Sequence, residues 1–380
     1  MKENFIMLTV TRPTKINDIF KKKQLPELKH SQISNYMQRL KNDLLHPIKT
    51  YEEFLAWCET KNKNHESEPD SPIIIKYEAT TDQYPTNSLR AVFSSRRLLS
   101  GAENVQSINA DATYKLNIFG LPVIIIGSTD RRRHFHPLCI AVSTTEKSED
   151  FAFVFHSLKN AIEKELQHDF SPAILIADAA DSITNGFETT FGTEFKRVVC
   201  WAHVVRNIVK KMKELRIDEE LRNQILNDIR MIQRSESSVI FNASCKLFEK
   251  KWNAYNSHPV VSFVKYFRVT WVRKGFEWTA ATTLRYPVTN NALESVNKSI
   301  KDFYTLRKKL VFREFLESLL KIVCDWSTTR NPSSPNFKKY FTDVEVSNDL
   351  KKKSIQWKSE ASKKGFKQFL IVVTIILKEI

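Results

Sequence analysis

The sequence predicts a mixed α/β fold in which a sheet carries helices and a separate helical region follows. Strand-like apolar segments and amphipathic segments succeed one another from residue 107 to residue 201 in the order β-β-β-α-β-α-β. Residues 204–286 instead repeat apolar side chains at helical spacing between charged faces. Only seven glycines occur in the chain, which argues against glycine-rich phosphate loops and against a β-propeller.

Three strands are expected first, in the segments SINADATYKLNIF, LPVIIIGST and LCIAVSTT, at residues 107–119, 121–129 and 138–145. The links between them are short, and short links join antiparallel neighbours, because parallel strands need a longer crossover. The second segment is almost wholly apolar, which is typical of a strand buried on both faces. The three segments therefore predict an antiparallel meander with a central middle strand.

Helices and strands alternate after the meander. Residues 148–166 form an amphipathic helix, and residues 171–182 contain a short apolar run that predicts a fourth strand. A short helix over residues 183–192 ends at Gly192, and residues 195–201 predict a fifth strand. A meander followed by this alternation favours a mixed sheet with helices on its faces.

The organisation of the chain follows from these patterns. We expect five regions: a helical N-terminal region at 1–100, a core at 101–204, a helical insertion at 205–286, the end of the core at 287–327, and a lysine-rich C-terminal region at 328–380. An apolar run near the C-terminus, residues 369–377, is shorter than the roughly 20 residues that span a bilayer. It is interpreted as a buried strand or helix end, or as the mark of a truncated reading frame.

The charge balance points to a polyanionic partner. Lysine and arginine number 59 against 43 acidic residues, a net charge of +16, which favours nucleic acid over a membrane surface. The five cysteines are scattered and odd in number, so a disulfide framework is not indicated and a reducing compartment is expected.

Two aspartates stand where a strand would normally carry apolar residues. Asp111 lies inside the first predicted strand, and Asp178 follows the run AILIA of the fourth. A carboxylate in such a place is unfavourable unless it is paired or holds a cation. If the two strands are neighbours, both carboxylates meet at one edge of the sheet and suit a divalent metal. Alternatively, Asp111 is a strand-edge or turn residue, and Asp178 or Asp181 caps the following helix.

Glu294, in TNNALESVNKSIK, is a third candidate acid. Helical spacing places it on one face with Asn297, Lys298 and Lys301, opposite an apolar stripe formed by Leu293, Val296, Ile300 and Phe303. A carboxylate followed by lysines suits a metal beside a phosphate backbone. A helix start with Asn291 and Glu294 as a capping box explains the same residues equally well.

A lone C-x-x-H pair, Cys200 and His203, follows the fifth strand and leads into a basic helix. Its spacing is that of metal ligands, but a zinc site would need two more. His258 and Cys245 are the candidates for these. The alternative is a structural or DNA-proximal role.

Four of these segments together resemble the core of a Mutator-like element (MULE) transposase: INADATYKLN, ILIADAADS, CWAHVVRN and TNNALESVNKSIK. Their order and flanking letters agree with that family over about residues 25–325. The resemblance implies a ribonuclease H-like core with a helical insertion, and a catalytic and metal-binding triad of Asp111, Asp178 and Glu294. It also implies two Mg²⁺ or Mn²⁺ ions, with Cys200 and His203 as the C-x-x-H signature of the family.

The implied function is DNA transposition by cleavage of element ends and strand transfer. The expected partner is double-stranded DNA, bound by a homo-oligomer in the nucleus, with no membrane partner. Basic residues of a predicted hairpin turn, of the helix after the C-x-x-H pair and of the Glu294 helix are expected to contact DNA; they are Arg131, Arg132, Arg133, Arg206, Lys210, Lys298 and Lys301.

The chain departs from the family in its cysteines. Family members often carry zinc modules at either end, whereas here Cys58 stands alone among the first 100 residues and no cysteine follows Cys324. A domesticated or decayed derivative that binds DNA without catalysis is therefore the alternative function. A simple ribonuclease H-like nuclease is a further alternative, which leaves the helical insertion and the C-x-x-H pair unexplained.

Overall fold

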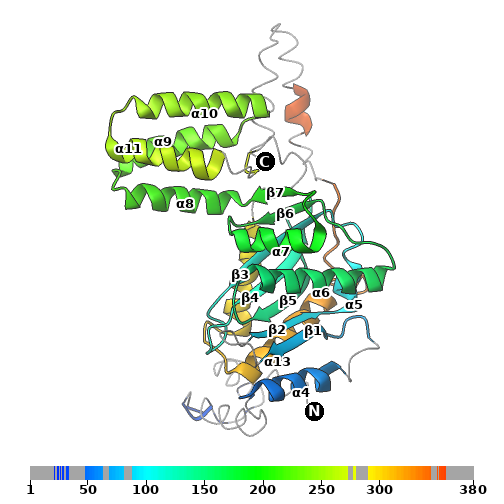
Figure 1. Cartoon of the computed structure of the whole chain (residues 1–380). Coiled ribbons are helices and arrows are strands. Elements are labelled where there is room, and N and C mark those ends of the chain that lie inside the picture. The colour runs from blue at the N-terminus through cyan, green and yellow to red at the C-terminus, as the bar shows by residue number, and fades with distance from the viewer. Residues whose placement is uncertain are drawn as a thin grey trace.

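A computed structural model describes residues 48–62, 68–80, 88–272, 277–279, 290–343 and 351–356, together with isolated residues between 21 and 33 and Asp349. The apolar run at 369–377 lies outside the described residues. A seven-stranded sheet occupies the middle of the molecule, helices cover both of its faces, and a group of helices lies beyond one edge (Figure 1). Among the described residues, no helix is long and apolar enough to cross a membrane.

The sheet is mixed, with the strand order β1-β2-β5-β4-β3-β6-β7. Strands β1 to β5 pair antiparallel, whereas β6 is parallel to β3 and β7 is parallel to β6. Their bounds are Ile73–Thr80, Ser88–Ser94, Ser107–Thr113, Val123–Thr129, Phe135–Ser143, Ile174–Ala177 and Lys196–Val199. The predicted meander is thus confirmed as β3-β4-β5.

Alternation along the strands divides the core into two layers. In β4, Val123 and Ile125 face one layer and Ile124 and Ile126 face the other. Helices α5 (Arg96–Ser100), α6 (Ser148–Leu166) and α7 (Asp181–Phe191) cover the second face, and α4 (Tyr51–Asn62), α12 (Asn291–Ser299) and α13 (Phe312–Thr328) cover the first (Figure 1). Residue 107 onward therefore follows the predicted element order.

Close packing of α6 on α7 depends on Gly186. A Cβ at this position would lie 2.6 Å from the Cβ of Phe151 and 2.8 Å from the backbone nitrogen of Ala152. We expect Gly186→Ala to lower the free energy of unfolding by about 1–3 kcal/mol through overpacking, despite the better helix propensity of alanine. Urea denaturation followed by circular dichroism measures this. Glu188→Ala, an exposed change on the same helix, should leave stability unchanged, and equal stability of both variants would contradict the packing argument.

The helices beyond β7 have a core of their own. They are α8 (Trp201–Glu214), α9 (Glu219–Gln233), α10 (Ser238–Asn253), α11 (His258–Phe267) and the π-helix η1 (Arg268–Val272). Trp278 is fully buried among them and stacks on Trp201 with ring centroids 5.7 Å apart. The chain returns to the sheet at Glu277, which bridges Val198 in parallel. The prediction of helices after residue 204 is confirmed for the residues described up to 272.

Strands β1 and β2 were not predicted, because residues 1–100 were interpreted as helical. Tyr51–Asn62 is indeed a helix, but the next described elements add two strands beside β5. Most side chains of β1 are only half-buried, so its burial does not alternate as in a strand with one apolar face. The boundaries of the five regions themselves stay a prediction.

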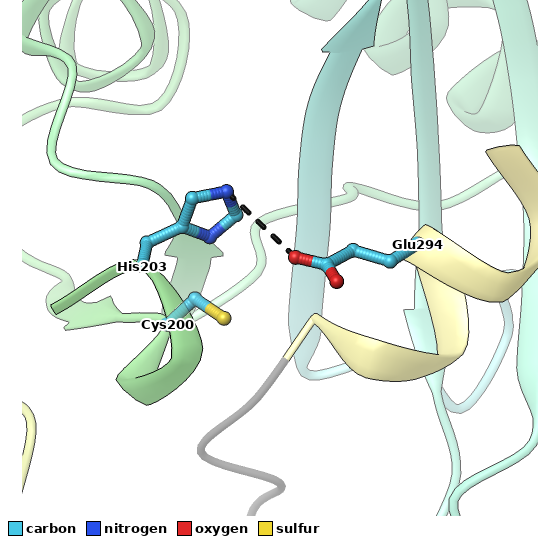
Figure 2. Close-up of side chains that lie close together, drawn as sticks. All are labelled: Cys200, His203 and Glu294. Atoms are coloured by element: carbon cyan, nitrogen blue, oxygen red, sulfur yellow. Dashed lines mark ion pairs between the residues drawn. The ribbon is translucent and has the colours of Figure 1, made fainter. Parts of the chain in front are cut away.

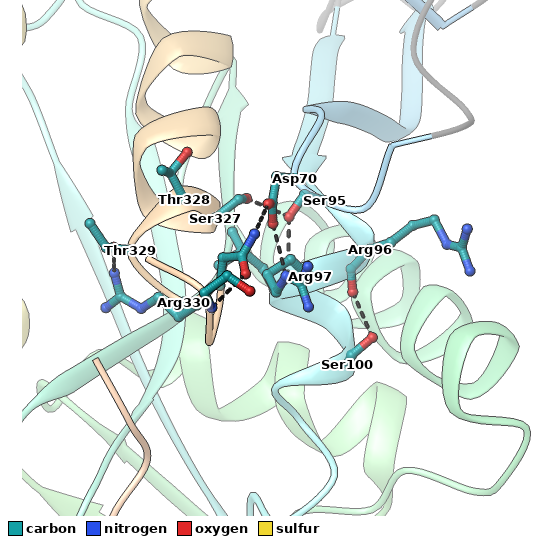
Figure 3. Close-up of polar contacts among 12 residues, drawn as sticks. Asp70, Ser95, Arg96, Arg97, Ser100, Ser327, Thr328, Thr329 and Arg330 are labelled. Atoms are coloured by element: carbon teal, nitrogen blue, oxygen red, sulfur yellow. Dashed lines mark hydrogen bonds and ion pairs between the residues drawn. The ribbon is translucent and has the colours of Figure 1, made fainter. Parts of the chain in front are cut away.

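Polar contacts join the start of α5, the end of α13 and the loop before β1 (Figure 3). The hydroxyls of Ser95 and Ser327 lie 2.6 Å apart, and the Asp70 carboxylate accepts bonds from Arg97 at 2.8 Å and Asn331 at 2.7 Å. Arg330 donates to the carbonyl oxygen of Phe135 at 2.8 Å. The segment after α13 is therefore packed on the sheet in its described part.

Candidate active site

One pocket of about 440 Å³ opens where β3 and β6 end. The carboxylates predicted from the sequence all line it: Asp111 near the end of β3, Asp178 directly after β6, and Glu294 in the first turn of α12. Parallel pairing of β3 with β6 brings the first two to the same edge of the sheet. Helix α12 crosses the face of the sheet to which the side chain of Asp111 points. This position of the helix brings Glu294 to the same pocket.

Asp111 is the most constrained of the three acids. Ile108 and Ala110 of β3 face the layer of α6, so alternation turns Asp111 toward the layer of α12. There its Oδ2 accepts a bond from Nδ2 of Asn297 at 2.8 Å. Burial, and secondarily the negative charge of Asp178, raises the pKa of Asp111 to about 7. Without a cation, this carboxyl is only partly ionised at neutral pH.

Asp178 is held by the turn between β6 and α7. Its Oδ1 accepts a bond from the backbone nitrogen of Ala180 at 3.0 Å, a local turn contact. Helix α7 begins at Asp181 with Ala180 as its N-cap and no side-chain cap bond, so neither aspartate caps this helix. The buried guanidinium of Arg197 donates to the backbone carbonyl of Asp178 from behind. The turn is thus fixed while the other carboxylate oxygen is left to the pocket.

Glu294 points across the pocket toward α8 (Figure 2). Its carboxylate makes an ion pair with Arg206, and its Oε1 lies 3.8 Å from Nε2 of His203. The N-cap of α12 is Asn290, not Asn291, and no side chain caps the helix. The capping-box interpretation of Glu294 is therefore wrong, because its carboxylate does not return to the helix start.

Cys200 and His203 come together beside Glu294 (Figure 2). One ligand atom of each residue lies within 4.8 Å of the others, and among the described residues this is the one such group of three. Neither His258 nor Cys245 joins it, so the part of the chain that the structure describes supplies no fourth zinc ligand there. Burial raises the pKa of the Cys200 thiol, and burial with the nearby Arg206 lowers the pKa of His203. Both groups are thus favoured in their neutral forms.

Cations line the same pocket as the acids. Arg206, Lys298 and Lys301 were predicted to contact DNA and do line it, and Arg307 joins them. Burial lowers the pKa of Lys301, although Asp111 partly opposes this. Lys210 lies one turn further along α8, beside a second hollow. The pocket therefore combines clustered carboxylates with a positively charged rim.

Arg131, Arg132 and Arg133 do not line the pocket. They form the turn between β4 and β5, and antiparallel pairing places this turn at the opposite end of the strands from Asp111 and Asp178. The Arg132 guanidinium lies 3.6 Å from the ring centroid of Phe341, and the Arg131 backbone nitrogen bonds to the Phe341 carbonyl at 3.0 Å. A contact of this turn with DNA stays a prediction, separate from the pocket.

Several pocket residues were missed by sequence reasoning. Glu146, in the loop before α6, is a fourth carboxylate, and burial raises its pKa, whereas a hydrogen bond from Tyr114 opposes this. A single acid in the charged stretch TTEKSED carries no signal. Asn297 was assigned to an exposed face but is buried at 8% exposure. Its spacing of three residues from Glu294 was the available signal.

The predicted apolar stripe of α12 is wrong at its last member. Leu293 and Ile300 are buried, but Phe303 is 70% exposed. The helix changes at Ile300 to the π-helix η3 (Ile300–Tyr304), which has a wider turn. The extra residue per turn rotates Phe303 away from the sheet, while Lys301 still reaches the pocket.

In a comparison with known families, the MULE transposase domain matches residues 107–207. The matched stretch runs from the start of β3 into α8 and so includes Asp111, Asp178, Cys200 and His203, whereas Glu294 lies outside it. The resemblance drawn from the four sequence segments is thereby confirmed for this stretch. No curated protein matches the chain. The match suggests a transposase-related function, for which DNA is the general partner and a divalent metal the general cofactor of the family.

Proposed function

We propose that the chain is a Mutator-like transposase of the Asp-Asp-Glu class, which cuts DNA and joins a freed 3′ hydroxyl to target DNA in a metal-dependent reaction. One observation carries the proposal: Asp111, Asp178 and Glu294, which are far apart in the sequence, line one pocket with a cationic rim. The family match supports it because the matched stretch contains both aspartates.

The strand order supports a ribonuclease H-like core. Strands β5, β4 and β3 are antiparallel, and β6 and β7 continue the sheet parallel to β3. This is the order expected for the core that the resemblance implies. On this proposal, helices α8 to α11 belong to the insertion between the second and third acids, and β1 and β2 extend the sheet at its other edge.

The residues of the pocket fit Mg²⁺ or Mn²⁺. Oxygen ligands suit these ions, and a cation would offset both the cost of burying charged carboxylates and their mutual repulsion. Burial, and secondarily the charge of Asp178, raises the pKa of Asp111. Three pocket residues also carry a buried polar atom with no hydrogen-bond partner among the described residues: Oε1 of Glu146, Nδ1 of His203 and Oδ1 of Asn297. Polar atoms of this kind suit a hydrated ion.

Asp111, Asp178 and Glu294 would hold the metal, after Glu294 exchanges its ion pair with Arg206. Two bound ions would activate the attacking oxygen and stabilise the leaving oxygen of a phosphodiester. The residues of the chain itself supply the rest. Lys298, Lys301 and Arg307 bind the phosphates beside the scissile bond, and their positive charge offsets the charge that develops there.

A non-catalytic DNA-binding derivative is the second candidate, favoured by the ion pair between Glu294 and Arg206. An arginine on the third acid is a stable arrangement for a pocket that never binds metal. Both side chains are partly exposed, however, so the pair is weak and a metal would displace it readily.

Purified chain, supercoiled plasmid and a short duplex with a free 3′ hydroxyl test the proposal. We expect nicked plasmid and joined duplex–plasmid products with MgCl₂ or MnCl₂, and none with EDTA. A duplex that ends in a dideoxynucleotide is the control, because it cannot be joined while nicking continues. Plasmid binding without any metal-dependent product would identify the non-catalytic derivative instead.

The proposed function also implies where the protein acts and in what form. Chromosomal DNA as substrate would place the protein in the nucleus, and pairing of two element ends would require a homo-oligomer.

A further inference from the structure

We infer that Cys200, Asn109 and Asn290 are positioning residues, which together fix the start of helix α12 and thereby set Glu294 opposite Asp111 and Asp178. The inference rests on the proposed function and adds to it a role for the cysteine of the C-x-x-H pair. These residues act through Glu294 and do not themselves contact DNA. All three side chains are fully buried, at 0% exposure.

Asn290 is the centre of the network. Its Oδ1 accepts a bond from Nδ2 of Asn109 at 2.7 Å, and its Nδ2 donates to the carbonyl oxygen of Ala110 at 3.3 Å. Its backbone nitrogen donates to Sγ of Cys200 at 3.1 Å. Its carbonyl oxygen accepts the backbone nitrogen of Glu294 at 2.7 Å, the first turn of α12. Asn290 therefore connects the catalytic helix to two other segments.

The choice of partners of Asn290 is unusual for its place in a helix. An asparagine at the N-cap normally bonds its side chain to the free N–H groups of the first turn, which stabilises the helix. Asn290 occupies the N-cap of α12 but makes no such bond. Its side chain is directed to β3 instead. The start of α12 therefore lacks the stabilising N-cap bond, and the side chain of Asn290 instead attaches the helix to the strand that carries Asp111.

Each acid-bearing segment is attached to this network. Asn109 lies two residues before Asp111 on the same face of β3, and its Oδ1 is fixed by the backbone nitrogen of Thr129 at 3.0 Å. The backbone nitrogen of Cys200 donates to the carbonyl oxygen of Ala177 at 2.9 Å, directly before Asp178. The network thus relates the positions of Asp111, Asp178 and Glu294 to one another.

A second attachment lies further along the helix. Asn297 donates to the Asp111 carboxylate at 2.8 Å, so α12 is joined to β3 on both sides of Glu294. Buried polar groups that are fully paired favour one arrangement over its alternatives, because any shift leaves a donor or acceptor without a partner in a low dielectric. The first turn of α12 is held in this way.

The thiol of Cys200 serves here as an acceptor for a backbone N–H. Figure 2 shows the sulfur turned toward the start of α12. As a zinc ligand, Cys200 would be a thiolate and would need ligands beyond His203 and Glu294. The two roles respond differently to substitution. A serine hydroxyl retains a hydrogen-bond acceptor, whereas both serine and alanine would remove a zinc thiolate.

Cys200→Ala and Cys200→Ser are therefore compared with the wild type and with Cys245→Ala, a matched truncation of a buried cysteine in α10. The readouts are the single-turnover cleavage rate with MnCl₂, the Kd for duplex DNA, hydrogen exchange of a peptide covering residues 290–299, and bound zinc. Misplacement by about 1 Å can reduce a rate by about 100-fold. We expect Cys200→Ala to cleave ten- to 100-fold more slowly at unchanged Kd, with faster exchange over residues 290–299.

Cys200→Ser should recover most of the rate and of the exchange protection, and Cys245→Ala should match the wild type in both. No variant should carry stoichiometric zinc. An alanine variant with wild-type rate and exchange would overturn the inference, as would one zinc per wild-type chain that both Cys200 variants lose. If the wild type cleaves no DNA, the proposed function fails, and hydrogen exchange still decides whether Cys200 holds the start of α12.

Discussion

Asp111→Asn is expected to reduce metal-dependent DNA cleavage by about 10²- to 10³-fold, the loss typical of removing one electrostatic group at a reacting centre. The same change should make the metal-free protein more stable above neutral pH. Asparagine preserves the shape of the side chain but removes its charge. It therefore removes a metal ligand, and it also removes the cost of burying a charged carboxylate together with the smaller repulsion by Asp178.

The raised pKa of Asp111 determines how the stability of the protein changes with pH. In the folded protein the pKa of Asp111 is about 7, against 3.8 for an ordinary aspartate. The folded state then binds the proton more tightly than the unfolded state does, so the stabilisation is complete below pH 3.8 and is lost as the pH rises through about 7. A divalent ion should restore stability mainly at the alkaline end of this window.

Thermal unfolding in EDTA between pH 5 and pH 8, beside the plasmid assay, measures both effects. The wild type should lose Tm toward pH 8 and regain it with MnCl₂, whereas Asp111→Asn should show a flatter profile and little response to the metal. Asp169→Asn, an exposed change of the same kind in the loop before β6, should behave as the wild type. Wild-type cleavage by Asp111→Asn would exclude this carboxylate from the reaction.

The sequence was informative about the site where chemistry and strand pattern conflicted. Asp111 interrupts an apolar strand and Asp178 directly follows one, and a carboxylate in such a place is unfavourable without a partner, so the positions of both indicated a shared site. The place of Glu294 could not, because its helix reaches β3 through contacts such as that between Asn109 and Asn290, which are 181 residues apart. A local pattern contains no information about which distant helix covers a given strand.

The arginines of the β4–β5 turn show a second limit of prediction from the sequence. The three arginines of this predicted hairpin turn are expected from the sequence to contact the phosphate backbone of DNA. In an antiparallel meander, however, the turn after β4 lies at the end of the sheet where β3 begins, whereas Asp111 and Asp178 lie where β3 and β6 end. Strand direction thus separates Arg131–Arg133 from the pocket.

The exposed position of Phe303 has a local cause, the π-helix at Ile300, which a prediction from regular helical spacing does not include.

Trp278→Ala is expected to lower the free energy of unfolding by about 3–5 kcal/mol, the usual range for removing a buried tryptophan. The indole is fully buried, stacks on Trp201, and contacts Phe241 and Phe267 edge-on. Its Nε1 also donates to the carbonyl oxygen of Trp271 at 2.7 Å. Truncation therefore leaves both a large cavity and an unpaired carbonyl. Urea denaturation measures the loss, and Tyr255→Ala, an exposed aromatic truncation in the same helical region, is the control.

Trp278 also connects this helical core to the pocket of the candidate active site. Its stacking partner Trp201 directly follows Cys200 and opens helix α8, which carries His203 and Arg206. Its neighbour Glu277 pairs with β7. Loss of the indole should therefore loosen the start of α8. We expect this to reduce DNA cleavage even in the absence of urea, where the sheet remains folded. A variant that loses the expected stability but cleaves DNA at the wild-type rate would show that the helices beyond β7 fold independently of the site.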